Sequence, residues 1–137
     1  MIVLRQIEKD DYSNAKSILK VNGIEDDLSQ GIIYIINNGD CIMGVSKIII
    51  KDNYGILKYV VVKEKFRGLN YGDSLLRGIL FKCKSMGINK VYYHGYDSYL
   101  LKKGFTNNKT SILVDHKLYT EVDNILNNTC CGGTNGV

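Results

Sequence analysis

A basic turn with two glycines joins an apolar segment to an amphipathic one in the middle of this chain. The apolar segment ends in Y-V-V-V (residues 59–62), and the turn is K-E-K-F-R-G-L-N-Y-G (residues 63–72). A helix is predicted over 72–86, where apolar residues recur every three or four positions. The first amides of a helix lack an intrahelical acceptor, and the helix dipole adds partial positive charge there. The sequence therefore predicts a phosphate or pyrophosphate site where the turn meets the helix.

This turn resembles the acetyl-CoA-binding motif of the GNAT superfamily of N-acetyltransferases, [Q/R]-x-x-G-x-[G/A]. Its six positions correspond to Arg67, Gly68, Leu69, Asn70, Tyr71 and Gly72. The apolar triplet that precedes the motif in the family corresponds to Val60, Val61 and Val62. The chain departs from the pattern at Asn70, where the family has a glycine. Asparagine adopts the left-handed conformation more readily than other non-glycine residues, so we expect the turn to form.

The resemblance implies that acetyl-CoA is the cosubstrate and that no metal takes part. The backbone of Val60–Val62 would pair with the pantetheine amides, as an added strand does at a sheet edge. Amides from about Gly68 to Asp73 would hold the pyrophosphate. We expect the Asp73 carboxylate to point away from it, because like charges repel.

Three basic side chains flank the predicted pyrophosphate site. Lys63 and Lys65 are placed to reach the 3′-phosphate, and Arg67 would add charge or brace the loop.

Two catalytic positions of the family are changed in this chain. Ile56 lies at about the place of a glutamate that many members use as general base, and Leu100 replaces a tyrosine that protonates the leaving thiolate. Tyr99 is the neighbour of Leu100, and one residue rotates a helix by ~100°. Tyr99 is the candidate acid if the short helix is irregular.

The candidate replacements for the base are His94, Tyr59 and Asp97. His94 ends a predicted strand beside the acetyl position, and histidine is the side chain whose charge changes nearest neutral pH. A structural histidine is the competing interpretation. Water and proximity alone, without a dedicated base, are a further alternative.

The remaining elements supply the order strand, helix, antiparallel meander, helix, strand, helix and strand. Strands are predicted at 2–6, 32–37, 41–50, 54–62, 89–94 and 111–114, and helices at 12–21, 72–86, 97–103 and 119–127. The helix that joins 54–62 to 89–94 favours a parallel pair with a right-handed crossover. The resemblance, which includes a helix ending in Gly-Phe at 104–105, implies an α/β (α+β mixed sheet) GNAT fold. Its central sheet is mostly antiparallel, with a splayed parallel strand pair and flanking helices.

Composition limits the class of protein. A net charge of +4 without an Arg-rich run does not indicate nucleic-acid binding, and no apolar stretch has membrane length. The N-terminus lacks the features of a signal peptide, so a cytoplasmic location is expected. We expect one GNAT-like acyl-CoA-binding domain over 1–127 and a flexible tail containing Cys and Gly over 128–137. Cys130 and Cys131 in that tail lack C-x-x-C spacing, and a metal-binding or redox tail is the less favoured interpretation.

The function predicted from these features is N-acetyl transfer from acetyl-CoA to a small-molecule or peptide amine. The acceptor is left open, since it would be shaped by residues 22–31 and by segments after 105. A homodimer is compatible with the family. A CoA-binding module without turnover, acting as a sensor or interaction partner, is the main alternative, and a domain that binds another phosphate ligand is the third.

Overall fold

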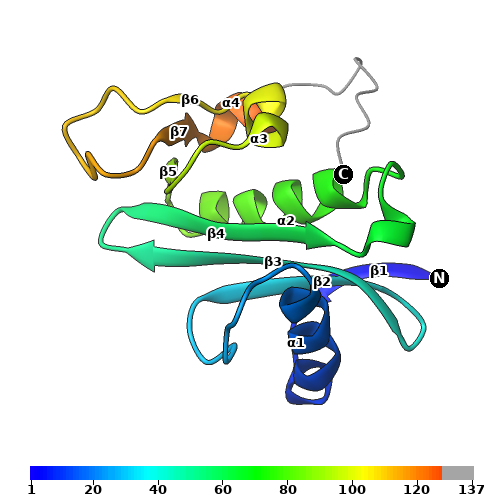
Figure 1. Cartoon of the computed structure of the whole chain (residues 1–137). Helices are drawn as coiled ribbons and strands as arrows, with labels where there is room; N and C mark the ends of the chain where they lie inside the picture. Colours follow the sequence, from blue (N-terminus) through cyan, green and yellow to red (C-terminus); the bar gives the residue numbers. More distant parts are fainter. Residues whose placement is uncertain (128–137) are drawn as a thin grey trace.

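Strands β3 (Cys41–Lys51) and β4 (Tyr54–Val62) form the middle of the sheet, because their side chains are largely apolar on both faces. The computed structural model describes residues 1–127, and within them the strands follow the order β1-β2-β3-β4-β5-β7-β6 (Figure 1). The other strands are β1 (Ile2–Gln6), β2 (Ile32–Asn38), β5 (Lys90–Tyr93), β6 (Thr106–Asn107) and β7 (Leu118–Glu121). The pair β4–β5 is parallel, and the other neighbouring strands are antiparallel. The predicted fold class is confirmed.

The two longer helices cover opposite faces of the sheet (Figure 1). Helix α1 (Tyr12–Val21) follows a short 3-10 turn, η1 (Lys9–Asp11), and α2 (Tyr71–Ser85) follows η2 (Glu64–Phe66). The shorter α3 (Ser98–Lys103) and α4 (Val122–Leu126) flank β6 and β7. No helix within residues 1–127 combines the length and apolarity that crossing a membrane requires.

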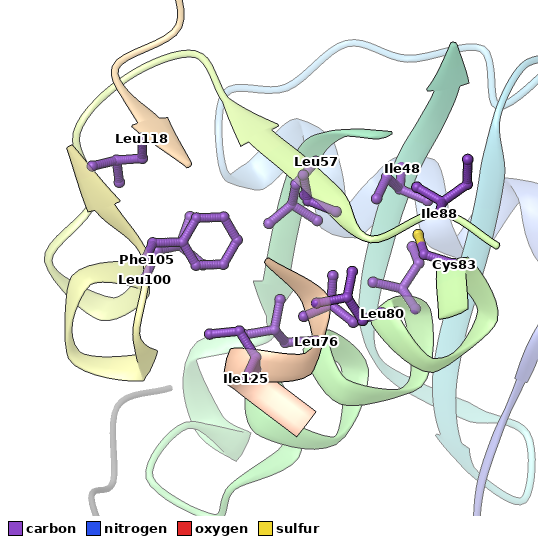
Figure 2. Close-up of a cluster of buried hydrophobic side chains, with 13 residues drawn as sticks. Ile48, Leu57, Leu76, Leu80, Cys83, Ile88, Leu100, Phe105, Leu118 and Ile125 are labelled. Carbon is purple, nitrogen blue, oxygen red and sulfur yellow. The ribbon is translucent and has the colours of Figure 1, made fainter. Parts of the chain in front are cut away.

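The larger core lies between α2 and the sheet. Figure 2 shows Leu76 and Leu80 of α2 facing the sheet, with Phe105 and Ile125 at the end nearest α3 and α4. Phe105, the second residue of the predicted Gly-Phe marker, is almost fully buried in this core. Its burial fixes α3 beside the end of β5.

A β-bulge at Lys58 separates two halves of β4. Tyr59 pairs with Lys47 of β3 and Leu57 pairs with Ile48, so Lys58 is the extra residue. The bulge reverses the alternation of side chains along β4. Leu57 packs in the core under α2, whereas Tyr59, two residues later, packs in the core under α1.

The parallel pair separates at the same place. Pairing between β4 and β5 ends at Ile56 and Tyr92, while β4 continues to Val62. Beyond Ile56 the edge of β4 that faces β5 has no strand partner within the described residues. Figure 1 shows the chain after β5 running away from β4 toward α3, so the predicted splay is present.

Two predictions for the C-terminal third were wrong. Residues 111–114 form no strand, because Ile112 is 41% exposed and Val114 is 72% exposed. Residues 119–121, predicted to begin a helix, instead belong to β7, in which Leu118 and Thr120 are buried and paired with β5. Helix α4 begins only at Val122. The predicted tail, with Cys130 and Cys131, lies outside the described residues.

Candidate functional site

The turn after β4 adopts the conformation that its glycines and Asn70 predict. Gly68 has a φ of +83°, and a Cβ built on it would meet open space. Asn70 caps α2 with φ 67° and ψ 15°, in the left-handed region. Its carbonyl accepts the first helical hydrogen bond, from Ser74 N at 3.1 Å. The amides of the intervening residues 71–73 therefore have no acceptor inside the helix.

Arg67 braces the loop. Its Nε donates to the carbonyl of Val62 at 2.9 Å, and its Nη2 donates to Asn22 Oδ1 at 3.0 Å. The side chain thereby ties the end of β4 to the end of α1. Beside it, Lys63 and Lys65 line a cavity of about 670 Å³ between the loop, α1 and the β2–β3 turn.

The carboxylate of Asp73 is held by basic side chains of α2 and α3. It forms ion pairs with Arg77 Nε at 3.0 Å and with Lys103 Nζ at 2.8 Å. Lys103, at the end of α3, is only 7% exposed. The negative charge in the first turn of α2 is therefore neutralised by cations on the side facing α3.

A cavity of about 130 Å³ occupies the space between the splayed strands. Its lining consists of side chains from β4, β5, α3 and two loops: Ile24, Leu57, Tyr59, Val60, Val61, Tyr93, Asp97, Tyr99 and Leu100. The cavity thus borders the unpaired edge of β4, just before the turn that leads into α2.

A wider cleft of about 570 Å³ lies on the α1 side of the sheet. It is lined by the loop after α1, by β3 and β4, and by the end of β5: Gly23, Ile24, Glu25, Asp26, Lys47, Lys58, Tyr59, Tyr93 and His94. The cleft and the small cavity share Ile24, Tyr59 and Tyr93. These three side chains stand where the two spaces meet.

Residues 2–99 match the model of the acetyltransferase (GNAT) family. The chain belongs to this family. No curated protein sequence matches the chain.

Solved GNAT structures share the fold. The chain aligns over 89% of its length with N-acetylglutamate synthase from Neisseria gonorrhoeae, complexed with coenzyme A and N-acetylglutamate, at 14% identity and a TM-score of 0.77. It spans only 35% of that longer protein. It spans 99% of the PaiA N-acetyltransferase from Thermoplasma acidophilum, in complex with coenzyme A (88% of this chain, 14% identity, TM-score 0.72). An acetyltransferase of the GNAT family from Staphylococcus aureus aligns with 89% of this chain, which spans 99% of that protein, at 19% identity and a TM-score of 0.72.

Tyr99 lines the small cavity although it is one residue away from the GNAT position. Both Tyr99 and Leu100 contribute to the lining, because α3 is short and begins directly at Ser98. The Tyr99 hydroxyl is buried and has no hydrogen-bond partner within residues 1–127. Burial, with a further contribution from the Asp73 charge, raises the pKa of this phenol well above its usual range. The group therefore stays protonated near neutral pH.

Two of the three candidate bases of this GNAT chain are engaged elsewhere. Asp97 caps α3, with its Oδ1 accepting from Leu100 N at 3.0 Å. Tyr59 donates its hydroxyl to Asp26 Oδ2 at 2.7 Å, and burial and this carboxylate raise the pKa of Tyr59 above its usual range. His94 is exposed on the wall of the wider cleft and stacks against Tyr93 at 4.7 Å between ring centroids.

The sequence-based interpretation missed an ion pair beneath the cleft. Lys47 Nζ lies 2.8 Å from Asp26 Oδ2, and the two side chains are only 7% and 14% exposed. Together with Tyr59 they hold the loop after α1 against the sheet. One signal was available, since Lys47 interrupts the apolar strand sequence I-M-G-V-S-K-I-I-I and a buried lysine requires a partner.

The left-handed Asn70 leads to a test of the GNAT loop. Asn70→Gly should leave the free energy of unfolding unchanged or higher, because glycine adopts this conformation without strain. Asn70→Val should lower it by about 1–2 kcal/mol, because a β-branched residue resists positive φ. Urea unfolding of both variants measures the difference. Equal stabilities would mean that this position is not left-handed in solution.

Proposed function

We propose that residues 1–127 form one acyl-CoA-binding domain that transfers an acetyl group from acetyl-CoA to an amine. The observation that carries this proposal is that the small cavity, the unpaired edge of β4 and the N-terminus of α2 follow one another along the chain. The unpaired edge of β4 borders the small cavity at one end and leads, through the turn, into the N-terminus of α2 at the other. Such an arrangement fits a long ligand with amides along its stem and a pyrophosphate at its end. The coenzyme A complexes of the Neisseria and Thermoplasma proteins support the same assignment.

The residues of the loop and of β4 would hold the cosubstrate. Backbone groups of Val60 and Val61 would pair with the pantetheine amides, whereas the Val62 carbonyl already accepts from Arg67. The loop from Gly68 to Asp73, including Leu69, Tyr71 and Gly72, would receive the pyrophosphate on its amides. Lys63 and Lys65 would face the nucleotide phosphate from the neighbouring cavity. The fit is supported by two features on this chain: open space at Gly68 and an orphaned hydroxyl at Tyr99.

Acetyl-CoA supplies an activated carbonyl, and the chain has to manage charge and protons around it. A backbone amide of β4 near Val60 would donate to the carbonyl oxygen as negative charge develops there. His94, which faces the cleft where an amine would enter, would take a proton from that amine directly or through water. Tyr99 would donate its proton to the departing sulfur, a role that suits a phenol kept protonated by burial.

A second candidate function is CoA binding without turnover. It is favoured by Ile56 in place of the family's glutamate and by the engagement of Asp97 and Tyr59 in structural hydrogen bonds. Release of free thiol from acetyl-CoA distinguishes the two, with a panel of amino acids, polyamines and peptides as acceptors. The transferase proposal expects amine-dependent release above the hydrolysis background. Binding of CoA with no release for any acceptor would support the non-catalytic function.

A further inference from the structure

The wider cleft contains a lysine that no carboxylate in the described part of the chain neutralises. Four charged side chains line it: Glu25, Asp26, Lys47 and Lys58. Asp26 and Lys47 neutralise each other at 2.8 Å. No carboxylate within residues 1–127 forms an ion pair with Lys58, which is exposed. The cleft therefore offers a free ammonium group to whatever enters it.

The bulge in β4 explains why the sequence neighbours Lys58 and Tyr59 both line the cleft. Consecutive residues of a regular strand point to opposite faces of the sheet. Lys58 is the extra residue of the bulge, so it and Tyr59 line the same cleft. Bulges next to active sites commonly redirect a side chain in this way. Tyr59 also borders the small cavity, so Lys58 stands beside the point where an amine would meet the acetyl group.

We propose, on the basis of the transferase function above, that Lys58 binds the carboxylate of a free amino acid whose α-amine is the group acetylated. The amine and the carboxylate of an amino acid are attached to one carbon, so an amine at the Tyr59 junction brings its carboxylate close to Lys58. Glu25, which lines the same cleft, disfavours a second carboxylate, which makes neutral and basic amino acids the expected acceptors. A peptide N-terminus lacks this carboxylate and should be a poor acceptor.

Matched acceptors that differ only in the carboxylate test this assignment. One set is leucine, leucinamide and 3-methylbutylamine, and a second is lysine, lysinamide and cadaverine. The wild-type protein should favour the free amino acid in each set by about tenfold in kcat/KM, as expected for a charge-assisted contact. Lys58→Met should bring this ratio close to one. Lys90→Met, which removes an exposed lysine at the far end of β5, should keep the ratio.

Two outcomes of these rate measurements would overturn the assignment. In one, the wild-type protein acetylates the amides or decarboxylated amines as well as the amino acids. In the other, Lys58→Met keeps the preference for the free amino acid. Calorimetric titration of leucine into the CoA-saturated protein gives a readout independent of turnover. The wild type could bind leucine but not leucinamide, lose this binding in Lys58→Met, and show no turnover. That result would mean that the transferase proposal fails and the carboxylate site stands. Absence of leucine binding in the wild type would remove the site itself.

Discussion

Tyr99→Phe is expected to lower kcat by about 10²–10⁴-fold, the usual cost of losing a general acid, while the protein becomes more stable. The two effects have one cause. The Tyr99 hydroxyl is buried without a hydrogen-bond partner in the described residues, so its removal should raise the free energy of unfolding by about 1 kcal/mol. Removing a functional group that lowers stability is expected to lower kcat and to raise the free energy of unfolding. Single-turnover kinetics and urea unfolding of the same preparation check both.

His94→Ala should reduce the rate of acetyl transfer at neutral pH by a similar factor, with little change in CoA affinity, because His94 lines the wider cleft and not the small cavity. His116→Ala is the matched control, since His116 is the chain's other histidine and lines neither of the two spaces. Wild-type rates in both Tyr99→Phe and His94→Ala would mean that the reaction proceeds on water and proximity alone. Neither residue would then belong in the catalytic set.

Asp26→Ala is expected to destabilise the protein by about 3–5 kcal/mol, because it leaves Lys47 buried and unpaired. Tyr59 would lose the acceptor of its hydroxyl in the same change. Asp27→Ala is the control, since the neighbouring Asp27 is exposed and accepts hydrogen bonds from Ser29, a local contact within its own loop. Chemical unfolding of the variants measures the difference.

The double variant Asp26→Ala/Lys47→Met distinguishes two causes of lost stability. One is the unpaired charge of Lys47, and the other is the loss of contacts that hold the loop after α1. Removing both charges of a buried pair is often nearly neutral, so the double variant should recover much of the stability that Asp26→Ala loses. The account of this ion pair would be contradicted by an Asp26→Ala protein as stable as the wild type. It would also be contradicted by a double variant less stable than either single variant.

The elements with regular periodicity were predictable from the sequence. Helices α1 and α2 and the meander β2–β4 lie within one or two residues of their predicted ranges, because the helices have apolar residues at helical spacing and the strands are apolar runs bounded by turn residues. The left-handed Asn70 was predictable from the GNAT motif, which has a glycine there, together with the conformational preference of asparagine. Residues 111–121 were not, since only pairing with β5 and β6 decides which of two similar apolar stretches becomes a strand.

The wider cleft is formed by contacts between segments that are distant in the sequence. Asp26 lies 21 residues before Lys47 and 33 before Tyr59, and nothing local to residue 26 indicates that these three side chains meet. The bulge at Lys58 also escaped prediction, because Y-G-I-L-K-Y-V-V-V reads as an uninterrupted strand. The cosubstrate side, in contrast, is contiguous in the sequence, and the predicted loop and the end of β4 lie together in the structure.

The measurement that tests the central claim most directly is thermal unfolding with and without coenzyme A, with ADP as the comparison ligand. A ligand that binds only the folded state stabilises it by about 2.7 kcal/mol at a concentration 100 times its Kd. Millimolar CoA is therefore expected to raise the Tm by several degrees, and ADP, which lacks the pantetheine stem that β4 would bind, by much less. No change in Tm with CoA, for a protein shown to be folded, would contradict the account. An equal change with ADP would mean that the site recognises only a phosphate ligand.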